Sequence, residues 1–137
     1  MKNNLKISLL IIAVGLVIIA GCKKNAASIV GTWTETTQRQ QEKIGANFVI
    51  DTTFNLPAPA PTVTFNTNGT YQSSNGNIGA GSYMLSGNKL TVTDTGSAGP
   101  QVLNVITLSD NALSLQQSTT DTAAPYPTYY YTINFKR

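Results

Sequence analysis

The fold class of this chain is decided by one short stretch, Thr62-Val63-Thr64-Phe65-Asn66-Thr67-Asn68-Gly69-Thr70-Tyr71. Val63 and Phe65 alternate with threonines, which is the two-residue period of a strand with one buried face. The polar cluster that follows is typical of a tight turn with Gly69 in a left-handed conformation. A second run then starts through Tyr71. The stretch therefore predicts a β-hairpin.

The same pattern recurs along the rest of the chain. Turn residues at 86–88 and at 109–111 each separate two short alternating runs, and the last run alternates apolar and polar residues from Tyr129 to Phe135. Successive hairpins predict an all-β, antiparallel up-and-down β-barrel of about eight strands, and a β-sandwich is the alternative. The residues expected to face the interior are Val63, Phe65, Tyr83, Leu85, Leu90, Val92, Leu113, Leu115, Ile133 and Phe135.

Three segments interrupt this pattern. Residues 38–48 are polar and predict a helical turn or a long loop, followed by a possible strand over 49–54 and a stiff, proline-rich extended segment over 57–61. Residues 94–100 and 118–127 predict two further long loops. Loops that rim a barrel are frequent carriers of function.

The N-terminal segment predicts an export signal rather than part of the fold. Lys2 and Lys6 precede an apolar run that ends in Ile19-Ala20-Gly21-Cys22, which resembles a bacterial lipobox. That resemblance implies that residues 1–21 are a lipoprotein signal peptide and that Cys22 receives a diacylglyceryl group and further acylation, such as palmitate. The run is shorter than a membrane-spanning helix needs, and a secretory signal with a chance cysteine is the other alternative.

Residues 22–28 are then the lipidated cysteine and a polar tether, and residues 29–137 are the barrel domain. The residues after Cys22 include no early Asp, so the inner-membrane retention signal is missing. We expect a lipid-anchored protein of the cell envelope, on the outer membrane and facing the periplasm. Two or three acyl chains give a stable anchor where one does not.

The composition argues against catalysis, metal binding and nucleic-acid binding. The chain has 137 residues, no histidine and one cysteine, so the commonest general base and metal ligand are missing. From Cys22 onward it carries seven basic side chains (nine less Lys2 and Lys6) and six acidic ones, a balance that gives no electrostatic case for nucleic acid. We expect no enzyme, no cofactor and no metal site, and we interpret Asp94, Asp110 and Asp121 as turn-capping residues.

Several short motifs together resemble the lipocalin-like domains of small bacterial lipoproteins. They are Ile29-Val30-Gly31-Thr32-Trp33, the hairpin at 64–71, the hairpin at 81–90, the run at 106–113 and the closing stretch Phe135-Lys136-Arg137. The resemblance implies that Trp33 plugs one end of the barrel and that Arg137 or Lys136 covers the indole. It also implies a cup that holds an apolar molecule.

The leading functional expectation is therefore non-enzymatic binding of a small apolar or amphipathic molecule. The alternative is an envelope-structural or protein-interaction module with a solid barrel core, for a protein partner that the sequence does not identify. Tyr129 and Tyr131 share one face and are expected to be core. Tyr126 and Tyr130 are the candidates for ligand contact, since aromatic rings give rigid amphipathic area for recognition.

Overall fold

The computed structural model describes residues 27–74, 79–97, 99–123 and 125–137, and in these residues it contains nine strands and no helix. Within the same ranges, no helix long and apolar enough to cross a membrane is found. The strands are β1 (Gly31–Ile44), β2 (Asn47–Asn55), β3 (Thr62–Phe65), β4 (Thr70–Ser73), β5 (Ala80–Ser86), β6 (Lys89–Asp94), β7 (Gln101–Leu108), β8 (Ala112–Thr120) and β9 (Thr128–Lys136).

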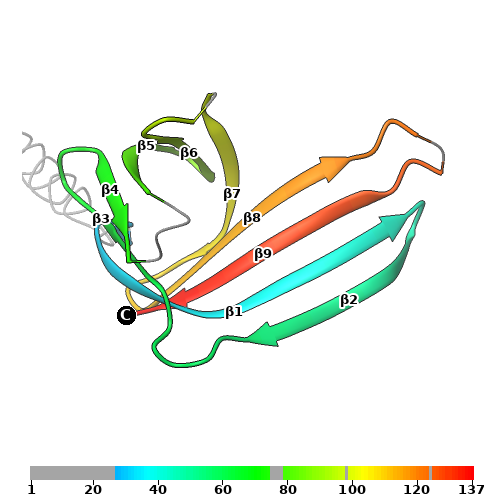
Figure 1. Cartoon of the computed structure of the whole chain (residues 1–137), viewed down its shortest axis with the longest axis horizontal. Helices are drawn as coiled ribbons and strands as arrows, with labels where there is room; N and C mark the ends of the chain where they lie inside the picture. The colour runs from blue at the N-terminus through cyan, green and yellow to red at the C-terminus, as the bar shows by residue number, and fades with distance from the viewer. Residues whose placement is uncertain (1–26, 75–78, 98, 124) are drawn as a thin grey trace, which may run out of the picture.

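Eight of these strands close into an antiparallel barrel. Neighbours follow in the order β1-β3-β4-β5-β6-β7-β8-β9, and β9 pairs back onto β1 from Thr34↔Lys136 to Lys43↔Thr128. The ninth strand, β2, pairs only with β1 and lies outside the ring (Figure 1). The predicted closed barrel of about eight strands is confirmed, and the sandwich alternative is not adopted. Closure leaves no free edge around the ring.

The predicted turns have the expected geometry. Gly69, between β3 and β4, has φ +79°, and Gly87, between β5 and β6, has φ +58°, a region that favours glycine because it has no Cβ. In the first turn, the Asn68 side chain accepts a hydrogen bond from the Thr70 backbone N–H at 3.1 Å. Local sequence therefore sets the register of these hairpins.

One end of the barrel is plugged by Trp33, whose side chain is fully buried. Its indole Nε1 donates to the Ile29 carbonyl at 2.7 Å, and the Arg137 guanidinium lies 4.0 Å from the ring centre. Arg137 Nη2 also donates to the carbonyls of Ser28 and Val30. Gly31, with φ +125°, leaves room for this side chain, because a Cβ there would lie 3.3 Å from the guanidinium. Of the two expected covers, the structure selects Arg137.

The apolar core lies next to this plug. Phe65 and Tyr83 meet edge to face with ring centres 4.9 Å apart, and Leu90 and Leu113 are almost completely buried. The Tyr83 hydroxyl donates to the Asn66 carbonyl at 2.8 Å, and burial raises the pKa of that hydroxyl. The core therefore packs the plugged half of the barrel.

The prediction of a helical turn or long loop over residues 38–48 is wrong. These residues complete β1 and begin β2, with the turn at residues 45–46. Residues 37–44 of β1 are hydrogen-bonded to β2 on one edge, and residues 37–43 are also hydrogen-bonded to β9 on the other. Pairing on both edges satisfies the backbone, so the segment is extended although its side chains are polar on both faces.

The second half of β1 belongs to a sheet that projects past the barrel. The far halves of β8 and β9 continue beside it, so that β2, β1, β9 and β8 form four neighbouring strands. Figure 1 shows this projecting sheet leaving the barrel at an angle, so that the molecule has the outline of an open V. The change of partner on β1 coincides with an irregularity in the β1–β9 register between Glu35 and Thr37, and such bulges bend a strand.

Two of the predicted loops need correction. The segment over 57–61 is not a uniformly extended rod, since the chain bends at residues 58–59 and the Ala58–Pro59 bond is cis. The loop expected over 118–127 is shorter, because β8 continues to Thr120 and only residues 121–127 connect it to β9. Composition alone does not predict the bend at residues 58–59 or the end of β8 at Thr120. The predicted strand over 49–54 is confirmed, and the predicted break over 94–100 begins one residue later, because β6 ends at Asp94 and β7 begins at Gln101.

Candidate functional site

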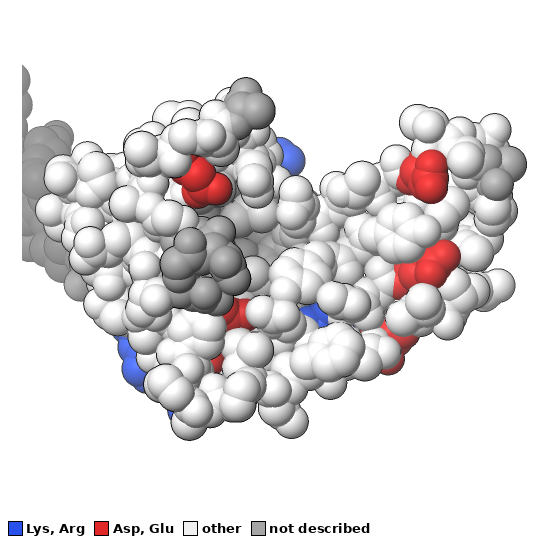
Figure 2. Space-filling view, in the orientation of Figure 1, with Lys and Arg blue, Asp and Glu red and all other residues white. Residues whose placement is uncertain are grey.

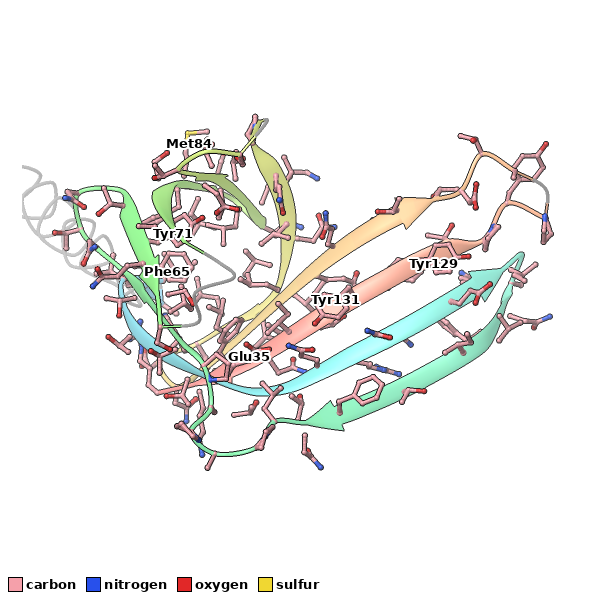
Figure 3. The ribbon with its side chains drawn as sticks, viewed as in Figure 1. Glu35, Phe65, Tyr71, Met84, Tyr129 and Tyr131 are labelled. Atoms are coloured by element: carbon pink, nitrogen blue, oxygen red, sulfur yellow. The ribbon has the colours of Figure 1, made fainter. Side chains whose placement is uncertain are left out.

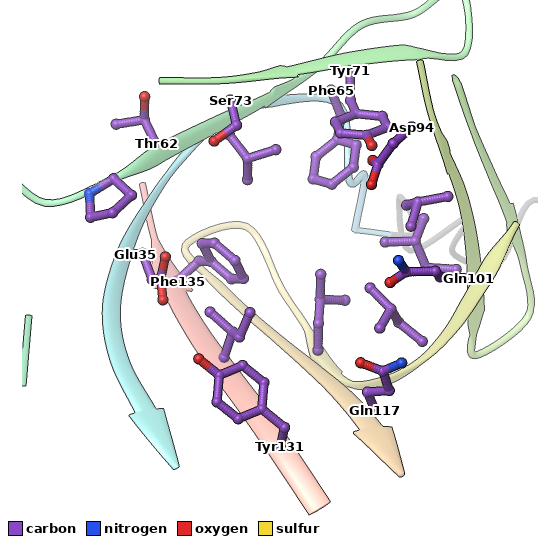
Figure 4. Close-up of a pocket in the computed structure, with 17 residues that line it drawn as sticks. Glu35, Thr62, Phe65, Tyr71, Ser73, Asp94, Gln101, Gln117, Tyr131 and Phe135 are labelled. Atoms are coloured by element: carbon purple, nitrogen blue, oxygen red, sulfur yellow. The ribbon is translucent and has the colours of Figure 1, made fainter. Parts of the chain in front are cut away.

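A cavity of about 300 Å³, whose lining does not include Trp33, occupies the barrel interior (Figure 4). It is partly open to the outside, and most of its wall is apolar. The apolar wall residues are Val63, Phe65, Leu90, Val92, Leu103, Leu115, Ile133 and Phe135. Most of these were expected to face inward, and they do so because paired residues on neighbouring strands share a face. The large side chains thus leave the interior partly empty.

Glu35 is the first polar feature of the cavity wall. It follows Trp33 by two residues on β1, so strand alternation turns it inward as well. Its side chain is only 5% exposed. Gln38 Nε2 donates a hydrogen bond to Glu35 Oε1 at 2.7 Å. A carboxyl group is therefore held at the cavity wall with a neutral amide as its neighbour.

Asp94 and Tyr71 form the second polar feature, on the opposite wall in Figure 4. Tyr71 on β4 and Asp94 on β6 each pair with Gly81 on β5, the strand between them, so all three residues are on the inner face. A Cβ at Gly81 would lie 2.8 Å from the Tyr71 ring and closer still to the Thr93 carbonyl. Glycine at this position therefore lets the Tyr71 ring pack against the backbone of β5 and β6.

The oxygens at this corner have unusual surroundings. Tyr71 Oη and Asp94 Oδ1 are both buried, and among the described residues neither has a hydrogen-bond partner. Tyr71 is 3% exposed as a whole. Buried polar groups in folded proteins are nearly always paired, so two unpaired oxygens in the wall of one cavity need an explanation.

A second cavity, also of about 300 Å³, lies on the projecting sheet. Tyr131 and Gln117 line both cavities, so the two adjoin each other. Register places Gln40, Tyr131 and Gln117 on one face, with Glu42, Tyr129 and Thr119 next to them. We call this face, bordered by Ile50 of β2, the trough. Figure 3 shows Tyr129 and Tyr131 following β9 toward Glu35.

Tyr131 marks the junction between the barrel cavity and the trough. Burial raises the pKa of its hydroxyl, and the negative charge of Glu35 raises it further. Burial and the Glu35 carboxylate therefore both disfavour the ionised form of Tyr131. In Figure 2 the visible surface is mostly uncharged and is hollowed between the barrel and the projecting sheet.

Strand alternation places the Arg39–Asp51 ion pair of the projecting sheet on the face opposite the trough. Arg39 donates two hydrogen bonds to the Asp51 carboxylate, at 2.7 and 2.6 Å. Hydrogen bonding by Arg39 lowers the pKa of Asp51, and Asp51 in turn raises the pKa of Arg39. Lys43 lies 5.7 Å from the Phe48 ring centre. These cations are thus engaged away from the barrel cavity.

The residues predicted as ligand contacts lie apart from the barrel cavity. Tyr126 is 62% exposed in the β8–β9 loop with φ +57°. Tyr130 borders the second cavity, and its ring packs against Phe48 with centres 6.3 Å apart. Their role in binding stays a prediction. The expected lipidation site, Cys22, lies outside the described residues.

Sequence reasoning missed four residues of the site: Glu35, Tyr71, Asp94 and Tyr131. Asp94 was interpreted as a turn cap, but it ends β6 and one of its oxygens is buried in the cavity wall. Tyr129 and Tyr131 were interpreted as core, but Tyr129 is 44% exposed and Tyr131 lines both cavities. For Glu35 a signal was available, because its two-residue spacing from Trp33 predicts an inward side chain.

The described residues contain no group of three His, Cys, Asp or Glu side chains that could hold a metal ion. The two carboxyl groups of the cavity come from different walls and are not joined by a third ligand. The chemistry available in the cavity is therefore apolar contact, hydrogen bonding and negative charge.

Comparison with protein families gives one match. A model of the lipocalin-like domain matches residues 29–115, from the start of the plug segment into β8. No curated protein and no solved structure matches the chain. The matched region contains seven of the barrel strands at least in part, and the structure adds β9, which closes the ring.

Proposed function

The chain belongs to the lipocalin-like domain family, and on that premise we propose that its barrel binds a small apolar or amphipathic molecule without transforming it. The observation that carries this proposal is the partly open, mostly apolar cavity of about 300 Å³ inside a closed barrel. Small-molecule sites are typically concave, largely apolar and fitted with a few polar groups, and about 300 Å³ is the lower end of their usual size.

The cavity favours binding over the alternative of a solid core. The buried inward residues pack in one cluster with Trp33, yet several of them also line a cavity that adjoins the trough at Gln117 and Tyr131. A barrel serving only as a structural module has no need of a hollow with polar groups on its wall.

Binding without catalysis fits the side chains present. The chain carries no histidine, and the cavity wall offers two carboxyl groups on opposite sides rather than a nucleophile with an adjacent base. The ligand we propose enters along the trough, past Tyr131, and its apolar part lies against Val92, Leu103 and Leu115.

We also propose that the protein is held at the outer membrane, facing the periplasm, by lipid on Cys22. The described fold begins close to the plugged end, where Arg137 binds the Ser28 carbonyl. A tether over residues 22–28 would therefore reach the barrel at its closed end. The cavity mouth and the trough lie at the other end, so they would face away from the bilayer and remain accessible.

The anchor is tested by Cys22→Ser and labelled palmitate. We expect the wild-type chain to incorporate label and to sediment with membranes, and the variant to do neither. A variant that still fractionates with membranes would contradict the anchor.

Binding is tested on the full lipidated chain in phosphatidylcholine nanodiscs, with empty nanodiscs as the blank. The probes are 2-naphthylethylamine, 2-naphthylethanol and 2-naphthylacetate, and calorimetry measures their affinities. Val92→Trp fills the cavity, whereas Val102→Trp adds the same ring on the outer side of the neighbouring strand, where Val102 is 51% exposed. We expect at least one probe to bind the wild type and Val102→Trp but not Val92→Trp. Unchanged binding to Val92→Trp, or no binding of any probe, would refute the proposal.

A further inference from the structure

We propose that the cavity selects a positively charged amphipathic molecule, an organic ammonium ion whose apolar body lies inside the barrel. This inference rests on the proposed function, because it names the class of molecule that the same cavity takes. It is carried by the corner formed by Tyr71 and Asp94 over Gly81, and by a second carboxyl group on the facing wall (Figure 4).

The Tyr71–Asp94 corner supplies acceptors that lack a donor. Tyr71 Oη and Asp94 Oδ1 are buried, and no described residue donates to either atom. An ammonium group has three N–H donors and a positive charge, so it matches two oxygens of which one belongs to a carboxyl group. Because Tyr71 and Asp94 both pair with Gly81 and both line the cavity, one head group bound at this corner contacts both residues.

Glu35 adds a second negative charge to the cavity. Gln38 gives it a hydrogen bond but no compensating charge, and the effect of Glu35 on the Tyr131 pKa indicates that its field reaches the cavity mouth. Two carboxyl groups in a largely apolar space repel an anionic head group and attract a cationic one. Fatty-acid-like carboxylates are therefore the molecules that this cavity disfavours.

No cation of the described chain lines the barrel cavity to neutralise these groups. Arg39 is paired with Asp51 on the face opposite the trough, and Arg137 covers Trp33 at the closed end. Because these cations lie elsewhere, we infer that the ligand supplies the positive charge that compensates the two carboxyl groups.

The apolar walls fix how such a ligand lies. Leu90 and Val92 precede Asp94 on β6, and Leu103 faces Leu90 across the β6–β7 pair. An apolar body in contact with these side chains has its head group at Asp94 and its tail toward Gln117 and Tyr131, where the cavity meets the trough. The body is therefore short, about the size of one or two fused rings.

The three naphthyl probes test this inference, because they share one apolar body and differ only in head group. On the wild-type chain in phosphatidylcholine nanodiscs, we expect 2-naphthylethylamine to bind at least about tenfold tighter than 2-naphthylethanol, and 2-naphthylacetate to bind weakest. Equal affinity of the amine and the alcohol, with Val92→Trp blocking both, would overturn the charge preference and leave the proposed function standing. Failure of all three probes to bind would overturn both.

Two substitutions locate the head group. Asp94→Asn should weaken amine binding about tenfold and leave alcohol binding nearly unchanged, while the matched control Asp110→Asn, in the exposed β7–β8 turn, should change neither. Tyr71→Phe should weaken amine binding by a smaller factor without lowering the melting temperature, since the hydroxyl it removes has no partner among the described residues. Amine binding that survives Asp94→Asn unchanged in a variant that melts like the wild type would contradict this placement.

Discussion

The barrel and the projecting sheet share β1, β8 and β9 but are held together by different interactions. On β1, Trp33 is fully buried, whereas the projecting strand β2 is exposed along its whole length. In the barrel, strand pairing is supplemented by a packed core around Trp33, Leu90 and Leu113. In the projecting sheet the strands are held by backbone pairing, aromatic contacts and an ion pair.

This difference teaches that β-structure here does not require a buried face. Residues 37–43 are paired on both edges and remain extended with polar side chains. In β1, β8 and β9, which the two regions share, hydrophobic burial stabilises the barrel end, and backbone pairing extends the strands beyond it. The cavity lies at the transition, where packing gives way to the trough.

The largest expected effect separates the two regions directly. Trp33→Ala removes a fully buried ring, its hydrogen bond to Ile29 and the contact with Arg137, so we expect the free energy of unfolding to fall by about 3–5 kcal/mol. Tyr129→Ala, at a residue of the trough that is 44% exposed, should cost less than about 1 kcal/mol. Urea unfolding of both variants measures this, and similar losses would contradict the division into two regions.

The next effect concerns Gly81, which pairs with Tyr71 and Asp94 of the cavity wall. Gly81→Ala places a Cβ against the Thr93 carbonyl and the Tyr71 ring, so we expect a loss of about 1–3 kcal/mol in unfolding free energy. Gly79→Ala is the matched control, because no described atom lies within 4 Å of a Cβ there. If both variants unfold at the same urea concentration, Gly81 is not a point of close approach.

A smaller effect tests the junction between the two regions. Because the pKa of Tyr131 is raised in the folded protein, the stabilisation that Tyr131 contributes is fully present below the pKa of an unfolded tyrosine. This stabilisation is lost as the pH rises through the pKa of Tyr131 in the folded protein. Glu35→Gln should lower this pKa part of the way, since burial is the larger cause and remains. Ring-carbon NMR titration measures it, with Tyr83 as control because burial alone raises its pKa. An unmoved Tyr131 pKa would show that Glu35 does not act at the mouth.

The smallest effect on stability is expected in the projecting sheet. The pKa of Asp51 is lowered in the folded protein, so the stabilisation that Asp51 contributes is present above the pKa of an unfolded aspartate. This stabilisation is lost as the pH falls through the pKa of Asp51 in the folded protein. Arg39→Ala should raise the Asp51 pKa toward its ordinary value while leaving the melting temperature almost unchanged, since exposed ion pairs contribute little. Carboxyl-carbon NMR and thermal unfolding check this, and a large fall in melting temperature would count against it.

Much of the fold was predictable because its signals are local. Alternation at Val63 and Phe65, glycine at the turns and the Gly-x-Trp segment each act within a few residues, and the barrel follows from repeating them. The polar half of β1 was not predictable, because its strand conformation depends on β2 and β9 on either side. Partners distant in sequence leave no local pattern.

The candidate site was predictable only in part, for a related reason. The apolar wall follows from alternation, but the Tyr71–Asp94 corner depends on a register that joins three strands across Gly81. Asp94 lies between a strand and a glycine-rich loop, so sequence alone favours the turn interpretation. Tyr131 was assigned to the correct face, yet that face continues past the packed core into the trough.

The central claim is that the barrel contains an open cavity that holds a small molecule, and intermolecular NOEs test it most directly. With 2-naphthylethylamine bound, the probe protons should give NOEs to the methyl groups of Val92 and Leu103, which line the cavity. Val102 and Ile106, more than half exposed on the outer side of β7, should give none. NOEs confined to the outer methyl groups, or none to Val92 and Leu103 at saturating probe, would contradict the account.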